Sequence, residues 1–108
     1  MYAMIWRYDT GTGSFDEMIK QVDREFADRI PEEVGSVLYA AVNTGEGTAL
    51  TVTFFPDAEA ATRAEATVTG VQQSLADRFG VSPIEVHRGE VLVSRANEAV
   101  TVPIRFAG

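Results

Sequence analysis

The chain has 108 residues, no cysteine and a formal net charge of −7, and these facts exclude several classes of protein. A chain of this length forms one domain, which buries roughly two-thirds of the surface that its unfolded form exposes. Without cysteine it has neither disulfide bonds nor thiolate metal ligands. The excess of sixteen acidic over nine basic residues disfavours binding to nucleic acid and to anionic membranes.

No apolar run approaches the roughly 20 residues of a membrane span, and no signal sequence opens the chain. We therefore expect a cytoplasmic protein. Eight of the nine basic residues are arginine and alanine is abundant. This bias is typical of a bacterial genome rich in G and C.

The first eight residues alternate with a period of two and predict a strand with Tyr2, Met4, Trp6 and Tyr8 on one face. After a glycine-rich loop, Ser14 and Glu17 have the spacing of a capping box and predict a helix start. Apolar residues then recur every three or four positions. They are Phe15, Ile19, Val22, Phe26 and Ile30. We expect Pro31 to end this helix.

Residues 34–55 predict a hairpin, because two runs of β-branched and aromatic residues flank the glycine-containing connection from Asn43 to Thr48. Both faces of its second arm carry apolar side chains. Leu50, Val52 and Phe54 lie on one face, and Ala49 and Phe55 lie on the other with Thr51 and Thr53. A sheet of this kind needs a cover on each side.

A second helix is predicted from Ala58 to Phe79, with Asp57 at its start and Gly80 as its C-terminal cap. The buried stripe comprises Ala61, Ala64, Val68, Val71, Leu75 and Phe79. Gly70 costs about 1 kcal/mol inside a helix. We therefore expect a kink or a break near residues 67–70.

Residues 84–93 predict the last long strand of the domain, with a bulge at Gly89. Residues 99–106 have the composition of a strand, but Pro103 confines them to a sheet edge. We expect residues 1–96 to form one domain and residues 97–108 to form a C-terminal tail. This tail could exchange with a neighbouring subunit as an edge strand.

The order strand, helix, strand, strand, helix, strand indicates an α+β, ferredoxin-like fold, βαββαβ, with both helices on one face of an antiparallel sheet. The opposite face is left with enough apolar surface that a monomer would rarely expose it. We expect the same face of a second copy to cover it. The homodimer would then enclose an α/β barrel between its two sheets.

With this order, the chain resembles the antibiotic-biosynthesis monooxygenase-like group of the dimeric α/β-barrel superfamily. The resemblance covers residues 2–93. It rests on Tyr2-Ala3 to Arg7, Pro31 to Gly35, Thr44-Gly45, Phe54-Phe55 followed by Asp57, and Glu90-Val91. These residues are mostly markers of the fold, and none of them is a catalytic signature.

The resemblance implies several activities, because the group contains cofactor-independent oxygenases of polycyclic aromatic substrates, haem-degrading enzymes and proteins with no known reaction. The haem-degrading members pair an Asn on the first strand with a Trp and a His on a later helix. Here the first strand has no Asn, and the only histidine, His87, lies on a predicted strand. The resemblance therefore does not extend to haem ligation, and we expect neither a cofactor nor a metal.

Six residues are candidates for a functional site. Trp6, Tyr8, Tyr39 and Phe55 could stack on a flat substrate, although aromatic residues more often fill cores and interfaces. His87 lies two residues from Glu85 on one strand and could act as a general base, while Arg7 could hold an anionic oxygen. A solvated strand face and a structural ion pair are the alternative interpretations of these two residues.

Three functions remain open at this point. A cofactor-independent monooxygenase acting on a small aromatic or polycyclic substrate predicts a cavity of several hundred Å³. A non-catalytic dimeric module would bind a small apolar ligand or a protein partner without turnover. A purely structural dimer would fill its barrel with side chains and leave no cavity.

Overall fold

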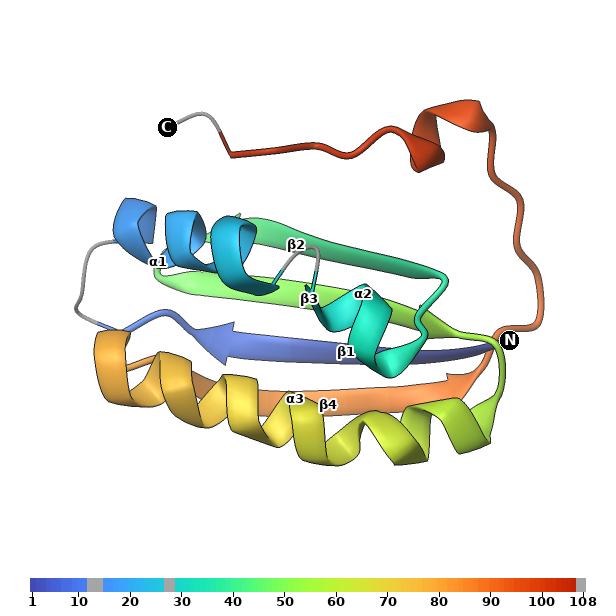
Figure 1. Ribbon diagram of the computed structural model, residues 1–108. Helices are drawn as coiled ribbons and strands as arrows, with labels where there is room; N and C mark the ends of the chain where they lie inside the picture. The colour runs from blue at the N-terminus through green and yellow to red at the C-terminus, as the bar shows by residue number, and fades with distance from the viewer. Residues whose placement is uncertain (12–14, 27–28, 107–108) are drawn as a thin grey trace.

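The computed structural model describes residues 1–11, 15–26 and 29–106. Its elements in chain order are β1 (Tyr2–Asp9), α1 (Phe15–Gln21), the π-helix η1 (Val22–Phe26), α2 (Arg29–Val34), β2 (Leu38–Gly45), β3 (Thr48–Phe55), α3 (Ala58–Phe79), β4 (Ser82–Glu90) and the 3₁₀ helix η2 (Glu98–Thr101). The strands form one antiparallel sheet in the order β2-β3-β1-β4 (Figure 1). This is the expected α+β, ferredoxin-like arrangement.

The register of the sheet separates its side chains into two sets. Tyr8 pairs with Ala49 and Tyr2 with Phe55, so the even residues of β1 share a face with the odd residues of β3. The helices pack on this face. The other face, called the open face below, has no helix among the described residues; it carries Ala3, Ile5, Arg7, Leu38, Ala40, Val42, Leu50, Val52, Phe54, Glu85 and His87.

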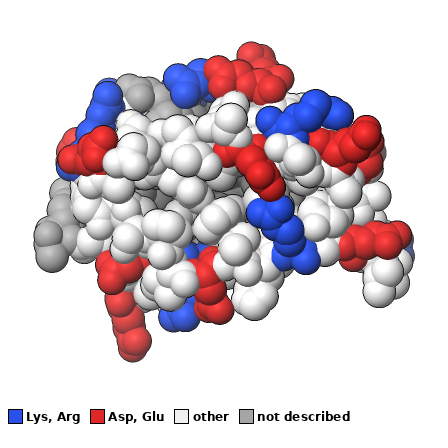
Figure 2. Space-filling view, turned by 90° about the horizontal axis from the view of Figure 1, so that it is seen from below, with Lys and Arg blue, Asp and Glu red and all other residues white. Residues whose placement is uncertain are grey.

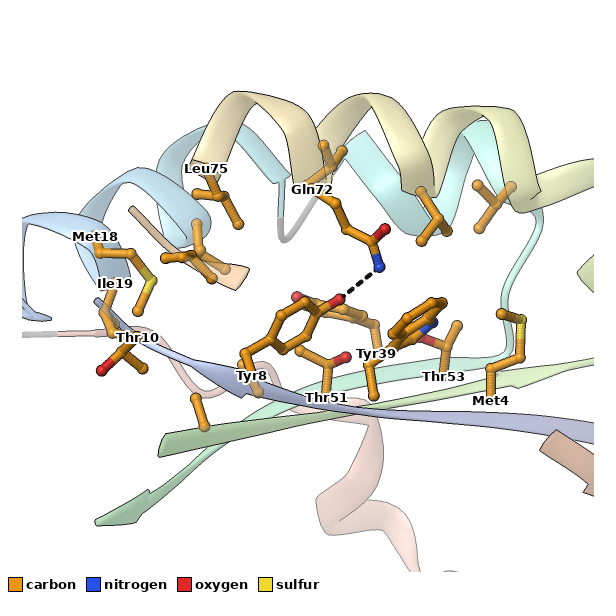
Figure 3. A pocket seen from close by; sticks show the side chains of 18 of the residues that line it. Met4, Tyr8, Thr10, Met18, Ile19, Tyr39, Thr51, Thr53, Gln72 and Leu75 are labelled. Carbon is orange, nitrogen blue, oxygen red and sulfur yellow. Dashed lines mark hydrogen bonds between the residues drawn. The ribbon is translucent and has the colours of Figure 1, made fainter. Parts of the chain in front are cut away.

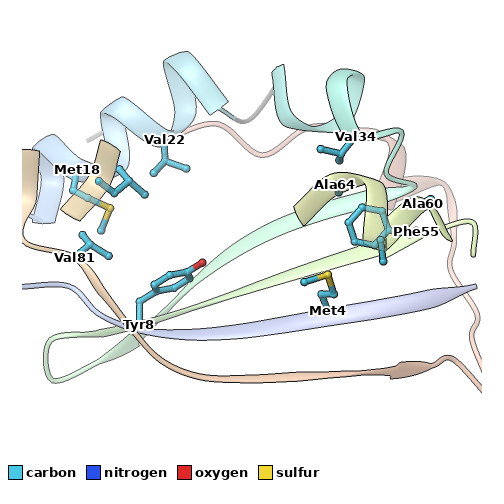
Figure 4. Close-up of a cluster of buried hydrophobic side chains, with 11 residues drawn as sticks. Met4, Tyr8, Met18, Val22, Val34, Phe55, Ala60, Ala64 and Val81 are labelled. Carbon is cyan, nitrogen blue, oxygen red and sulfur yellow. The ribbon is translucent and has the colours of Figure 1, made fainter. Parts of the chain in front are cut away.

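The hydrophobic core lies between the sheet and the helices (Figure 4). Phe55 is fully buried and Met4 is nearly so. They pack with Ala60, Ala61 and Ala64, whose small side chains let the first half of α3 approach the sheet closely. The stripe predicted for α3 therefore does face the core, and the two faces predicted for β1 are confirmed, with Met4 and Tyr8 on the buried one.

The first helical region differs from the expected single helix. It begins with α1 and changes to the π-helix η1 at Val22, whose hydrogen bonds span one residue more per turn. Pro31 does not end a helix but lies in the first turn of α2, where the N–H that proline lacks would have no helical partner. The expected cap at Ser14 lies outside the described residues.

Helix α3 is continuous from Ala58 to Phe79, so the expected break near Gly70 is wrong. Gly70 is exposed, and Val68 and Val71 beside it pack against the core; this packing outweighs the weak helix propensity of one glycine. The predicted cap is confirmed, because Gly80 has φ of 72° and donates its N–H to the carbonyl oxygen of Ala76. None of the described helices combines the length and the apolar character needed to span a membrane.

The end of the chain also departs from expectation. β4 ends at Glu90, and its irregularity lies opposite Arg7 and Tyr8 rather than at Gly89. Beyond it, residues 91–106 form an arm that runs back on the β2 side of the sheet (Figure 1). This arm lies outside the four strands of the sheet, although the N–H of Val91 donates a hydrogen bond to the carbonyl oxygen of Met1. The arm contains η2, and its Arg105 Nε lies 2.7 Å from Asp23 Oδ1 of η1.

The start of α3 yields a stability prediction. The side chain of Asp57 accepts a hydrogen bond of 2.8 Å from the N–H of Ala60. We expect Asp57→Ala to lower the free energy of unfolding by about 1 kcal/mol, because this N–H loses its partner. Asp57→Asn, which keeps an acceptor oxygen, should retain most of the stability in urea denaturation. Equal losses in the two variants would show that the cap is not the stabilising contact.

Candidate functional site

A cavity lies between the sheet and the helices, beside the buried core (Figure 3). Its volume, counted as space open to the centre of a water molecule, is about 70 Å³. One water needs about 10–15 Å³ of such space. The cavity is smaller than the several hundred Å³ that a monooxygenase site led us to expect. It is lined by Met4, Trp6, Tyr8, Thr10, Met18, Ile19, Val22, Val34, Tyr39, Ala41, Ala49, Thr51, Thr53, Phe55, Val68, Val71, Gln72, Leu75 and Val81.

A small group of polar side chains converges on the middle of this apolar cavity. The Nε2 of Gln72 on α3 donates a hydrogen bond of 3.0 Å to the hydroxyl oxygen of Tyr8 on β1 (Figure 3). Burial raises the pKa of Tyr8, and hydrogen bonds with Gln72 and Thr51 offset only part of that effect. Tyr8 is therefore a neutral phenol at neutral pH and keeps a proton that it can donate.

Tyr39 faces the same cavity from β2. Burial raises its pKa strongly, and the neighbouring Tyr8 raises it further, since two phenolate charges would repel one another. The hydrogen-bonding groups around the cavity are all neutral: phenols, threonine hydroxyls, an amide and an indole. Such a lining suits the aromatic rings and neutral oxygen substituents of a ligand, whatever groups that ligand carries outside the cavity.

Trp6 forms one wall of the cavity. Its ring lies 6.2 Å from that of Tyr8, centroid to centroid, at an interplanar angle of 23°. The indole nitrogen Nε1 is buried and has no hydrogen-bond partner in the described parts of the protein. An N–H donor in such a position favours an oxygen atom as its neighbour.

Two of the candidate residues lie elsewhere, on the open face. The Nη1 of Arg7 is 3.2 Å from Oε1 of Glu85, and the Nε2 of His87 is 3.2 Å from Oε2 of the same carboxylate. The hydrogen bond from His87, followed by that from Arg7, lowers the pKa of Glu85 below its usual range. All three side chains are well exposed, so this is a solvated cluster in the single chain.

The structure thus brings together Trp6, Tyr8, Tyr39 and Phe55 and separates them from His87 and Arg7 by the thickness of the sheet. The catalytic roles predicted for His87 and Arg7 would require a ligand on the open face. Sequence reasoning missed Gln72, although a signal was present: it lies four residues after Val68 and three before Leu75. A polar residue at that spacing falls on the buried side of α3.

The two cavity tyrosines make the free energy of unfolding depend on pH in the alkaline range. Their pKa values are raised by folding, so the unfolded chain ionises first, from about pH 10. The contribution of these tyrosines to stability is fully present below that pH. Above it, the free energy of unfolding falls by about 1.4 kcal/mol per pH unit for each tyrosine that stays neutral in the folded protein. We expect Tyr39→Phe to make this slope shallower in urea denaturation between pH 9 and 11. Identical slopes in the variant and the wild type would contradict the assigned burial.

Comparison with known proteins bears on the fold. No protein-family model matches the chain, and no curated protein matches its sequence. Solved structures do match. HapK from Hahella chejuensis has a TM-score of 0.69 at 15% identity, covering 90% of this chain and 98% of that one. A dimeric ferredoxin-like protein from an uncultured marine organism has a TM-score of 0.66 at 8% identity, covering 90% of this chain and 100% of the other.

A third match is a proposed antibiotic biosynthesis monooxygenase from Deinococcus radiodurans, with a TM-score of 0.65 at 15% identity. It covers 90% of this chain and 98% of the other. At these identities the likeness concerns the fold. The chain shares its ferredoxin-like fold with these proteins, the proposed antibiotic biosynthesis monooxygenase among them, as the resemblance in sequence indicated.

Proposed function

We propose that each subunit binds a small aromatic molecule in the cavity between sheet and helices, and that it oxygenates a phenolic ligand there without a cofactor. The observation that carries this proposal is the set of neutral donors inside an apolar, aromatic-walled cavity. The likeness in fold to a proposed antibiotic biosynthesis monooxygenase agrees with it.

The reaction that suits this lining uses the electrons of the substrate itself. An anthrone-type phenol has a CH₂ group flanked by aromatic rings, and loss of one proton leaves a delocalised anion. The anion reacts with O₂ and, after protonation, carries C–O–O–H at that carbon. Loss of water then leaves C=O, so one O₂ enters and one H₂O leaves. No other reductant is needed.

The contribution of the protein to this reaction is electrostatic. Tyr8 and Tyr39 stay protonated and can donate hydrogen bonds to the ligand oxygen on which negative charge develops. Gln72 holds the Tyr8 hydroxyl in place. The stacked rings of Trp6 and Tyr8 form a wall against which a flat ligand can lie.

A non-catalytic ligand-binding module is the second candidate function. It is favoured by one specific observation: the side chains around the cavity are uncharged, and the carboxylate and imidazole of Glu85 and His87 lie across the sheet. Proton removal would then depend on water or on the acidity of the ligand. A protein of this kind would bind the same ligands and leave them unchanged.

Oxygen consumption with anthrone at pH 7 distinguishes the two functions. An oxygenase should consume O₂ above the uncatalysed rate and release anthraquinone. Tyr8→Phe should slow this reaction roughly tenfold to a hundredfold by removing one donor. Tyr2→Phe serves as the control, because Tyr2 lies on the same strand outside the cavity. Binding of anthrone without any excess O₂ uptake would reject the oxygenase and support the second candidate.

We further propose that the protein is a homodimer in which the open faces of two subunits meet. The centre of this face is apolar: Val52 pairs with Ile5 on one side and with Ala40 on the other, and Val42 is 45% exposed. Burying such a patch is the dominant favourable term in association. The arm beyond β4 exposes Leu92, Val93 and Ile104 almost fully, and exchange of this arm with the second subunit would cover them.

A charge at the centre of the open face should break the homodimer. We expect Val52→Asp to raise the dissociation constant at least tenfold in sedimentation equilibrium, since two carboxylates would be desolvated at the interface. Thr62→Asp adds the same charge on the exposed side of α3 and should leave the dimer intact. Val42→Asp, on the edge strand, repeats the test if Val52→Asp unfolds. Unchanged association in both open-face variants would contradict the proposed interface.

A further inference from the structure

A second concave space lies next to the cavity, between α3 and β4. It measures about 180 Å³ by the same count, and it is lined by Met4, Trp6, Glu65, Val68, Thr69 and Arg88. We call it the side groove. Met4, Trp6 and Val68 also line the cavity, so these three side chains are the wall between the two spaces. A shift of this wall would join them.

The side groove has a chemical character that the cavity lacks. The Nη1 of Arg88 lies 2.9 Å from Oε1 of Glu65, and the side chains are 41% and 49% exposed. An ion pair as solvated as this contributes little to stability, so another carboxylate can replace that of Glu65 at small cost. On this side of the molecule basic and acidic side chains are interspersed, with no patch of one sign to repel an anion (Figure 2).

The wall itself offers a further donor. The N–H of Trp6 is buried without a hydrogen-bond partner in the described residues, and its ring borders both spaces. A ring oxygen of a ligand that crosses the wall would satisfy this donor. The cavity and the side groove together approach the lower end of the roughly 300–1,000 Å³ of small-molecule sites, and they give a ligand more room than the cavity alone.

We propose that the ligand is an aromatic molecule that carries a carboxylate, with its rings in the cavity and its carboxylate in the side groove. The guanidinium of Arg88 donates hydrogen bonds to this carboxylate in place of Glu65, in a geometry for which arginine is well suited. Arg88 is thus a specificity-determining residue. This inference rests on the proposed function, because it takes the cavity as the place of the aromatic rings.

Calorimetric titration with two matched probes tests the proposal. The probes are 2-naphthol and 6-hydroxy-2-naphthoate, which differ by one carboxylate. We expect the full-length wild type to bind the carboxylate probe at least tenfold more tightly at pH 7. Arg88→Gln should remove this advantage and leave the affinity for 2-naphthol unchanged. Glu65→Gln should raise the affinity for the carboxylate probe severalfold, because the competing carboxylate of Glu65 is gone.

Two controls accompany these variants. Arg63→Gln removes the same charge from an exposed pair with Glu59 on α3, away from the side groove, and should keep the full preference. Arg88→Lys keeps the positive charge but loses the paired N–H donors of the guanidinium, and it should keep part of the preference for the carboxylate probe. Equal affinity of the wild type for the two probes, or a preference that survives Arg88→Gln, would overturn the proposal while leaving the proposed function standing. Failure of both probes to bind would overturn the aromatic-ligand function and this inference with it.

Discussion

One layer of helices packs on a sheet that has two apolar faces, and this mismatch governs the rest of the structure. Tyr8 and Phe55 turn toward the helices and are buried, whereas Leu50 and Val52 turn away from them. A sheet covered on one side ordinarily carries polar side chains on the other. Here the centre of the second face is apolar, although Arg7, Glu85 and His87 lie beside it. One face therefore holds the core and the cavity, and we propose that the other associates with a second subunit.

The cavity exists because its lining combines rigid rings with small side chains. Tyr8 and Tyr39 line it together with the small side chains of Ala41, Ala49 and Thr51, which fill less of the space between the sheet and the helices. Burial keeps both phenols neutral, so the same side chains that create the space supply its donors. Gln72 fixes the position of one of them. The cavity therefore combines aromatic walls with neutral hydrogen-bond donors.

Most of the fold could be predicted from the sequence, because periodicity reports burial directly. The alternation of β1 and the stripe of α3 were assigned correctly, but the effects of single residues were not. Pro31 and Gly70 were expected to interrupt helices, and local position and tertiary packing overrode both. Contacts between side chains on different elements could not be predicted from the sequence. Arg88 and Glu65 are 23 positions apart, and only the register of β4 brings them together.

The proposed homodimer requires that the open face meet a second copy of the chain. An isotope-filtered NOE spectrum tests this directly, using a mixture of ¹³C-labelled and unlabelled protein. The proposed homodimer predicts contacts between subunits at the methyl groups of Ile5, Leu50 and Val52, and none at Val71 and Leu75, which line the cavity. Contacts between subunits that arise from the helices, or a monomer with no such contacts at all, would contradict it.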